Sequence, residues 1–421
     1  MRVWLTIGIV IVFAGVSGGA WWWLSSRSLS LVVDSSAPAE TDGALVLVSE
    51  GLPQGQEWRQ DFTFADMNGD GVLDLITAPP RKSAEPWPHI FLRERGRWAQ
   101  ACPNVARRGF PEQKEYVYGD VAVADFNGDG ILDIALAMHE TGLRILQGKS
   151  KGPCGPWEER HDLPQEMLQL RSRAIVAADM NRDGRPDIVA LSESPPMRGK
   201  SDTRGVVLLW NDSSGWRSQE LLGSEGIYGD DITVGEVNGD GILDIAIGSL
   251  IDQRPQFAWL SDGEGWWKAA IEGLPEYTIA WSVQLVDIDG DGRDELVLGA
   301  GGAPIRKNAG PRVYRWDGTR WHNLSQGLPQ ISWVSGVAAA DLNGDGRKEI
   351  VAAGMYTGIV QVYERQGDGM WRERQKFSLP TTQKLRNYKL RTVSTDDSGR
   401  ALVVGNFSAD KEGKILAWAW R

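Results

Sequence analysis

The chain has 421 residues, of which 42% are hydrophobic, and its 45 basic and 56 acidic side chains leave a formal net charge of −11. This length and hydrophobic fraction are typical of a folded globular protein with a large core. The negative charge argues against nucleic acid as a partner, because a phosphate backbone requires a basic face.

Residues 3–24 carry no charge, and such a run is long enough to cross a bilayer as a helix of about twenty residues. Three tryptophans at 21–23 lie where an interfacial aromatic belt is expected. A cleaved signal peptide, with small residues at 18–20 as its cleavage site, is the alternative. The run exceeds the roughly 7–15 apolar residues of a signal peptide, which favours an uncleaved anchor. Both readings place the body of the protein outside the cytoplasm, at a cell surface or in a periplasm.

Residues 25–43 are rich in Ser, Ala and acidic side chains, so we expect a linker between the anchor at 1–24 and a folded body at 44–421. Within the body one acidic stretch stands out, Asp125-Phe126-Asn127-Gly128-Asp129-Gly130-Ile131-Leu132-Asp133. Oxygen-bearing side chains at alternate positions of a tight loop can converge on a hard cation such as Ca²⁺. Glycine at the sixth position permits the sharp turn.

Six such loops occur, and they begin 51 to 59 residues apart, so the chain is built from repeats. The predicted ligands stand at positions one, three, five, seven (through the carbonyl) and nine: Asp66, Asn68, Asp70, Val72 and Asp74; Asp125, Asn127, Asp129, Ile131 and Asp133; Asp179, Asn181, Asp183, Arg185 and Asp187; Glu236, Asn238, Asp240, Ile242 and Asp244; Asp287, Asp289, Asp291, Arg293 and Glu295; Asp341, Asn343, Asp345, Arg347 and Glu349.

The simpler interpretation of these loops is that Asn and Gly only make hairpin turns. It leaves unexplained the acidic groups at positions one, five and nine, since clustered carboxylates repel one another unless a cation neutralises them. The pattern therefore predicts up to six Ca²⁺ ions in a structural role. A degenerate seventh copy around Asp396 keeps the flanking apolar runs but has lost the ligands, so we expect it to bind nothing.

Each loop lies between two apolar runs, and a third run and a fourth containing Trp follow, which predicts four short strands per repeat. This is typical of a β-propeller blade. The last repeat lacks a fourth strand, while residues 44–48 form a strand with no blade before it. We therefore predict an all-β, seven-bladed β-propeller whose N-terminal strand completes the last blade, preceded by one transmembrane helix.

The six acidic loops resemble the FG-GAP (VCBS) repeats of integrin α subunits and many bacterial surface proteins. Tyr118-Gly119, Tyr228-Gly229 and Gly302-Ala303-Pro304 are similar to parts of the dipeptides that name the family. The resemblance covers residues 44–421 and implies a calcium-binding propeller. It also implies a choice of functions: a docking or adhesion module for a protein partner such as a membrane complex, a lectin-like glycan binder, or a polysaccharide lyase-like enzyme.

The remaining side chains carry weaker expectations. We recognise no catalytic constellation, although Asp120, Asp230 and Asp231 precede loops and are expected near the ring centre. Cys102 and Cys154 lie in neighbouring repeats, and either a disulfide between blades or two buried thiols fits the sequence. Adjacent Trp266 and Trp267 cannot face the same side of a strand, which predicts that one of them is exposed and open to a sugar or a protein. The insertions at 192–205 and 299–311 are candidate contact loops.

Overall fold

The computed structural model describes residues 43–421 except 56, 59–60, 82–84, 86, 102–115, 118, 140, 194–203, 252–256, 264, 276–278, 302–307, 380–385, 395–399 and 410–411. These residues belong to one unit, Thr41–Arg421. The predicted anchor at 1–24, the linker up to residue 42, the centres of both predicted contact loops and the degenerate loop at Asp396 lie outside the described residues. Among the described residues, no helix is long and apolar enough to span a membrane.

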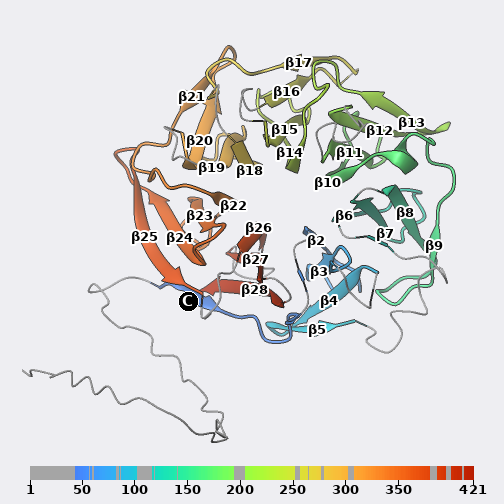
Figure 1. The fold of residues 1–421 in the computed structure, drawn as a ribbon, viewed down its shortest axis with the longest axis horizontal. Coiled ribbons are helices and arrows are strands. Elements are labelled where there is room, and N and C mark those ends of the chain that lie inside the picture. Colours follow the sequence, from blue (N-terminus) through green and yellow to red (C-terminus); the bar gives the residue numbers. More distant parts are fainter. Residues whose placement is uncertain are drawn as a thin grey trace, which may run out of the picture. The chain divides into compact units, whose positions relative to one another are not determined.

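Seven four-stranded antiparallel sheets stand around a central axis as the blades of a β-propeller (Figure 1). In chain order from the axis outwards, the strands of blades 1 to 3 are β2 (Phe62–Ala65), β3 (Asp74–Thr77), β4 (His89–Glu94) and β5 (Arg97–Gln100); β6 (Gly119–Ala124), β7 (Asp133–Met138), β8 (Gly142–Gly148) and β9 (Trp157–Glu159); β10 (Ser172–Ala178), β11 (Asp187–Ser192), β12 (Val206–Asp212) and β13 (Gly215–Glu220). A 3₁₀ turn at Met167–Gln169 follows β9.

Blades 4 to 7 continue the same order. Their strands are β14 (Gly229–Gly235), β15 (Asp244–Ser249), β16 (Phe257–Ser261) and β17 (Trp267–Ala269); β18 (Ile279–Val286), β19 (Glu295–Gly301), β20 (Gly310–Trp316) and β21 (Trp321–Asn323); β22 (Val334–Ala340), β23 (Glu349–Gly354), β24 (Ile359–Arg365) and β25 (Trp371–Ser378); β26 (Arg386–Ser394), β27 (Ala401–Ala409) and β28 (Glu412–Trp420), with β1 (Leu45–Leu47) as the outermost strand of blade 7. The predicted seven-bladed all-β fold is confirmed.

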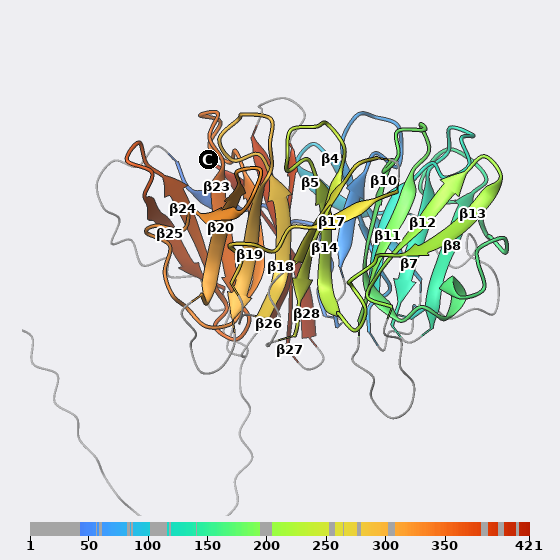
Figure 2. The same ribbon diagram turned by 90° about the horizontal axis from the view of Figure 1, so that it is seen from above.

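The burial of each strand explains its sequence pattern. The second strand of each blade packs between neighbouring blades on both faces, and β7, β11 and β15 are buried at every residue. Such strands show continuous apolar runs without alternation. The outer strands β13 and β25 cover one face only and keep exposed positions. Figure 2 shows the blades side-on, with their strands running between the two faces of the ring.

Tryptophans of the outer strands tie one blade to the next. Trp371 donates its indole N–H to the Leu324 carbonyl at 2.9 Å, and its backbone N–H to Gln326 at 2.8 Å. Trp321 makes the equivalent pair of bonds to the blade before it, through Ala270 and Glu272. Both tryptophans are buried between the blades, since each is at most 2% exposed.

Blade 4 has two adjacent tryptophans at the start of its outer strand. Trp267, not Trp266, begins the outer strand, paired with Ser261, and it packs against the core. Trp266 lies just before the strand and is 76% exposed. The prediction that one member of this pair is exposed is confirmed.

The N-terminal strand closes the ring as predicted. Leu45 pairs with Trp420 and Leu47 with Trp418, so β1 completes blade 7. The Gln375 side chain on blade 6 accepts the Leu45 N–H at 2.8 Å and donates to the Leu45 carbonyl at 3.1 Å. β1 is shorter than the strand predicted at residues 44–48. Beyond Leu47, the pairing with β28 continues through one backbone hydrogen bond, from the Val48 N–H to the Ala417 carbonyl.

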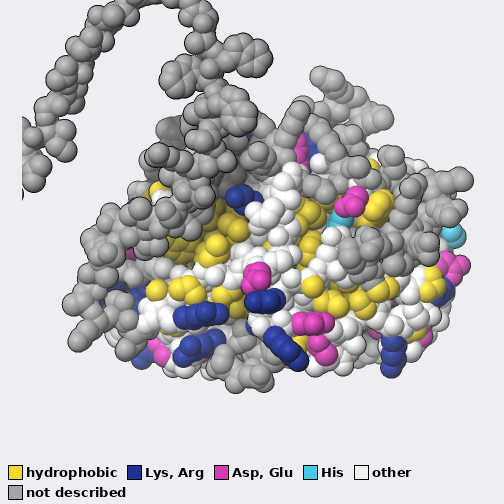
Figure 3. Space-filling model, turned by 90° about the horizontal axis from the view of Figure 1, so that it is seen from below, with side chains coloured by type: hydrophobic (Ala, Val, Ile, Leu, Met, Phe, Trp, Pro, Cys, Tyr) yellow, Lys and Arg dark blue, Asp and Glu magenta, His cyan; other side chains and the backbone are white. Residues whose placement is uncertain are grey.

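A groove of about 540 Å³ marks the seam where the chain ends close the ring, lined by Leu47, Leu379, Leu416 and Lys414 among others. Figure 3 views the rim on the side of β1, β28 and β5. Hydrophobic side chains gather in the middle of this view, and Lys and Arg side chains lie along its lower part.

Candidate metal-binding loops and ring centre

Each predicted loop connects the first and second strands of its blade. The first ligand follows directly on the end of the inner strand, and the ninth residue begins the second strand, as Asp66 and Asp74 do around β2 and β3. The same connection recurs in blades 1 to 6, so the six loops lie on one face of the ring.

Hydrogen bonds within each loop explain the acidic first position. In the first loop, Asp66 Oδ1 accepts the Gly69 N–H at 2.7 Å and the Asp70 N–H at 3.1 Å, while Oδ2 accepts the Gly71 N–H at 2.8 Å. The second loop repeats all three bonds through Asp125. In the fourth loop the longer Glu236 places Oε1 on the amides of Asn238 and Gly239 instead, at 3.0 and 2.6 Å.

The fifth and seventh positions are linked within each loop, and the Asn at the third position joins them in five of the six loops. Asn68 donates its side-chain amide to Asp70 Oδ2 at 2.9 Å, and Asp70 Oδ1 accepts the Val72 N–H at 2.8 Å. The seventh-position amide makes the same bond in the other five loops, at Ile131, Arg185, Ile242, Arg293 and Arg347. The structure therefore brings the predicted residues of each loop together.

Arg182 is the one loop residue whose backbone conformation conflicts with its type. It stands at the fourth position, where the first loop has Gly69 at φ 78° and the second has Gly128 at φ 74°. Arg182 adopts φ 60°, which is strained for a residue with a Cβ atom.

The ninth-position carboxylates are buried, and in the first four loops the fold itself satisfies both of their oxygens. Asp74 accepts the Met67 N–H at 3.0 Å on one oxygen and the Arg93 N–H from β4 at 2.9 Å on the other. Asp133, Asp187 and Asp244 make the matching pairs of bonds. These four residues hold the loop to the third strand of the blade.

Burial has the largest effect on the pKa of these carboxylates and raises it. Backbone hydrogen bonds have the next largest effect and lower it. Burial raises the pKa of Asp74, Asp133 and Asp187 to about 6. It raises the pKa of Asp244, Glu295 and Glu349 to about 7. The other acids of each loop add repulsion, so the ionised forms are costly without a cation.

The fifth and sixth loops carry Glu at the ninth position and differ from the first four. Glu349 bonds the Leu342 N–H at 2.9 Å and the side-chain amide of Asn343 at 2.9 Å. Glu295 bonds the Ile288 N–H at 2.8 Å, but its second oxygen is buried without a hydrogen bond. In that loop, oxygens of Asp287, Asp289 and Glu295 lie within 4.8 Å of one another.

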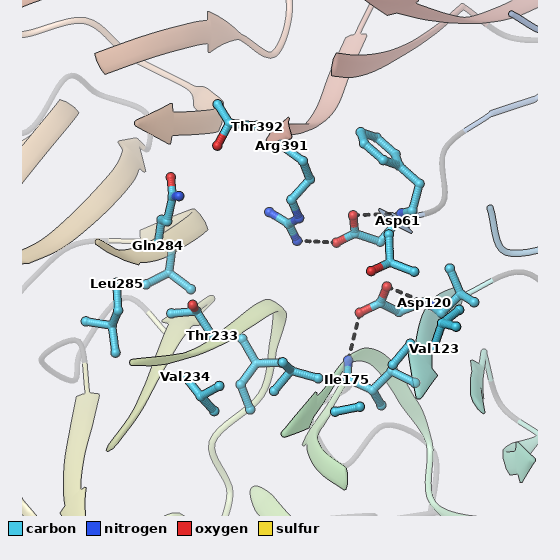
Figure 4. A pocket seen from close by; sticks show the side chains of 18 of the residues that line it. Asp61, Asp120, Val123, Ile175, Thr233, Val234, Gln284, Leu285, Arg391 and Thr392 are labelled. Carbon is cyan, nitrogen blue, oxygen red and sulfur yellow. Dashed lines mark hydrogen bonds and ion pairs between the residues drawn. The ribbon is translucent and has the colours of Figure 1, made fainter. Parts of the chain in front are cut away.

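A second cluster of charged residues lies at the ring centre, on the inner strands (Figure 4). Arg391 donates to Asp61 at 2.5 Å and to Asp231 at 2.7 Å, and Lys389 lies 3.0 Å from the same two carboxylates. These ion pairs join blade 7 to blade 1 and, across the ring, to blade 4. They border a cavity of about 270 Å³.

Asp120 is the third carboxylate of this centre, and it accepts the Val121 and Ile175 backbone N–H groups, both at 2.7 Å. Burial, and then the charge of Asp61, raise its pKa well above the usual range. Burial acts in the same direction on Asp231, but the charges of Arg391 and Lys389 outweigh it and lower that pKa to about 2.

The expected central position of Asp120 and Asp231 is therefore confirmed. Asp230 lies beside them and pairs with Arg173 at 2.7 Å. Asp61 and Arg391 were missed, although each stands five residues before its loop position, as Asp120 and Asp231 do. That fixed offset is the signal that would have found them. Cys154 is disulfide-bonded, and Cys102 lies outside the described residues.

The fold and the loops define an all-β propeller assembled from acidic-loop repeats. The chain contains FG-GAP-like repeats, since the family profile of that description matches residues 125–190, 237–298 and 302–352. The resemblance seen in the sequence is thereby confirmed.

Two further comparisons found similar proteins. Phosphatidylinositol-glycan-specific phospholipase D of Bos taurus is 28% identical over 188 residues, which span 39% of this chain and 22% of the bovine protein. A crystal structure of BBS1N in complex with ARL6DN, soaked with lead, has a TM-score of 0.51 at 11% identity, covering 88% of this chain and 94% of that one. The latter is a likeness of fold alone.

Proposed function

We propose that this protein is a calcium-binding, membrane-anchored, extracytoplasmic propeller that docks a protein partner. Calcium binding is supported by the buried ninth-position carboxylates, each of which lies near further acidic groups of its own loop. Such a set is destabilising when ionised and is relieved by a hard cation with oxygen ligands. The first, third, fifth and ninth side chains, with the seventh carbonyl, would hold the ion.

An aromatic strip on the face opposite the loops supports the docking role. Trp281 and Trp333 have ring centroids 6.3 Å apart, and Trp333 meets Tyr356 edge-on at 5.7 Å. The Arg386 guanidinium lies 5.3 Å over the Tyr356 ring. Trp333 has φ 60°, and strained backbone at a bulky residue is concentrated at functional sites. Aromatic and Arg side chains of this kind dominate the energetics of protein interfaces.

Two observations support export. The uncharged run at 3–24 is long enough for a membrane anchor. Cys154 is disulfide-bonded, and disulfides form and persist outside the reducing cytosol.

The docking proposal is tested by photo-crosslinking from the strip. A photoreactive residue replaces Tyr356 in the full-length protein in its own membranes, and a matched protein carries it at Met370, another exposed apolar position. We expect one protein to crosslink from position 356 and not from 370. Crosslinking equally from both positions, or from neither, would refute docking through the strip.

Glycan binding is a second candidate, favoured by the 76% exposure of Trp266. An exposed indole is a platform on which a sugar ring can stack. A glycan array probed with the native protein and with Trp266→Ala should then show a signal that the substitution abolishes. The charged residues at the ring centre pair with one another, so we do not extend the proposal to a lyase-like reaction.

A further inference from the structure

The fifth loop has an unsatisfied buried oxygen that the others lack. Glu295 is 1% exposed, and its Oε1 has no hydrogen bond, whereas both oxygens of the ninth carboxylate are bonded in the other five loops. In blades 1 to 4, the second oxygen accepts a backbone N–H from the third strand, and the residue that donates it pairs with the Trp of the outer strand. In blade 3, for example, the donor is Asn211, which pairs with Trp216. A buried oxygen without a hydrogen bond is costly, so a cation close to this one is stabilising.

The same loop is also the most acidic at its centre. It alone has Asp rather than Asn at the third position, Asp289. Its Asp287, Asp289 and Glu295 oxygens form the one group of three acidic, His or Cys ligand atoms within 4.8 Å that the described part of the chain contains.

A side chain from β20 supplies positive charge to this centre. Arg315 donates through Nη1 to Asp289 and through Nη2 to Asp291, and its Nε lies 3.8 Å from Glu295 Oε1. The strand register places other residues at the equivalent position of the remaining five blades, and none is basic: Leu92, Gln147, Trp210, Leu260 and Glu364. The Arg315 side chain is 36% exposed, so it can move away from the loop into the adjacent solvent.

We propose that Arg315 is the resident counter-ion of the fifth loop, and that a divalent cation binds this loop by displacing the guanidinium. This inference rests on the proposed calcium binding. In the metal-free protein Arg315 neutralises the acidic centre. When calcium binds, the carboxylates of Glu295 and of the loop aspartates coordinate the ion, and the Arg315 side chain moves into solvent. The fifth loop therefore differs from the other five, in which no basic residue stands opposite the ninth position.

The test measures bound calcium against free calcium by equilibrium dialysis of the folded, chelator-treated protein. Arg315→Gln removes the competing charge, and we expect one site to gain about tenfold in affinity. Adding Glu295→Gln should abolish that gain, whereas adding Glu349→Gln in the sixth loop should leave it. The control is Arg372→Gln, which removes an arginine paired with Asp368 away from the loops; it should change no affinity.

Thermal melting gives an independent readout. Arg315→Gln should lower the melting temperature of the chelated protein and enlarge the stabilisation by calcium, whereas Arg372→Gln should shift both states equally. Calcium binding by the native protein with no gain in Arg315→Gln would overturn the inference and leave the proposed function standing. Absence of calcium binding in every protein would overturn both.

Discussion

At the scale of single residues, the turns Gly273-Leu274-Pro275 and Gly327-Leu328-Pro329, which follow the outer strands of blades 4 and 5, depend on glycine because of close packing. A Cβ atom on Gly327 would lie 2.1 Å from the Trp371 carbonyl oxygen, and one on Gly273 would lie 2.2 Å from that of Trp321. Each glycine also has a positive φ, 93° and 87°. The turn therefore lets one blade approach the outer strand of the next.

Gly327→Ala should accordingly destabilise the ring by roughly 2–4 kcal/mol, since overpacking adds to backbone strain. Gly318→Ala is the matched control, because its φ is 100° and nothing lies within 4 Å of its Cβ position; we expect about 1 kcal/mol there. Chemical denaturation measures both. Equal losses in the two variants would show that close approach to Trp371 is unimportant.

The strained Arg182 gives the opposite expectation. Arg182→Gly gives the third loop the glycine that the other five loops have at the fourth position, and glycine adopts a φ of 60° without strain. Relief of the strain should stabilise the protein by about 1 kcal/mol. Asn181→Gly, one residue earlier, lacks that relief and should not stabilise. The denaturation midpoint with chelator present decides the matter, and an unchanged or lower midpoint for Arg182→Gly would contradict the strain argument.

At the scale of elements, β1 holds the two ends of the ring together. Leu45 is 4% exposed within blade 7, and Leu52, just beyond the strand, is 4% exposed against blade 1. A chain starting at residue 54 loses both leucines, each worth about 2–5 kcal/mol. Its melting temperature should fall well below that of a chain starting at residue 43. Equal melting of the two would rule out closure by β1.

The elements also show what the sequence could and could not predict. Loop spacing, apolar runs and the missing fourth strand of the last repeat predicted the blades and their closure, because each is a local pattern. The pairing of Arg391 with Asp231 across the ring was not predictable, since it joins residues 160 positions apart. The orphan oxygen of Glu295 was equally hidden, because it depends on which backbone amide a side chain reaches.

At the scale of the whole molecule, the buried ninth-position acids predict how stability depends on pH. Their pKa values are raised to about 6 or 7 in the metal-free fold, above about 4 in the unfolded chain. Their contribution to stability is complete below about pH 4 and is lost as the pH rises through 6 to 7.

The melting temperature of the chelated protein should therefore fall between about pH 5 and pH 8 relative to that of the calcium-loaded protein, in which the ions keep these groups ionised. Comparing the two states at each pH removes the contribution of groups outside the loops. Parallel pH profiles would contradict the assignment of the ninth-position acids as ligands.

The central claim is that calcium in these six loops stabilises the propeller. Calorimetric melting of the protein from residue 25 onwards, with saturating calcium and with EGTA, tests it most directly. An ion that binds only the folded state at 100 times its dissociation constant adds about 2.7 kcal/mol per site. We predict a melting temperature many degrees higher with calcium, with magnesium giving a smaller shift. The same melting temperature in calcium and in EGTA would contradict the account.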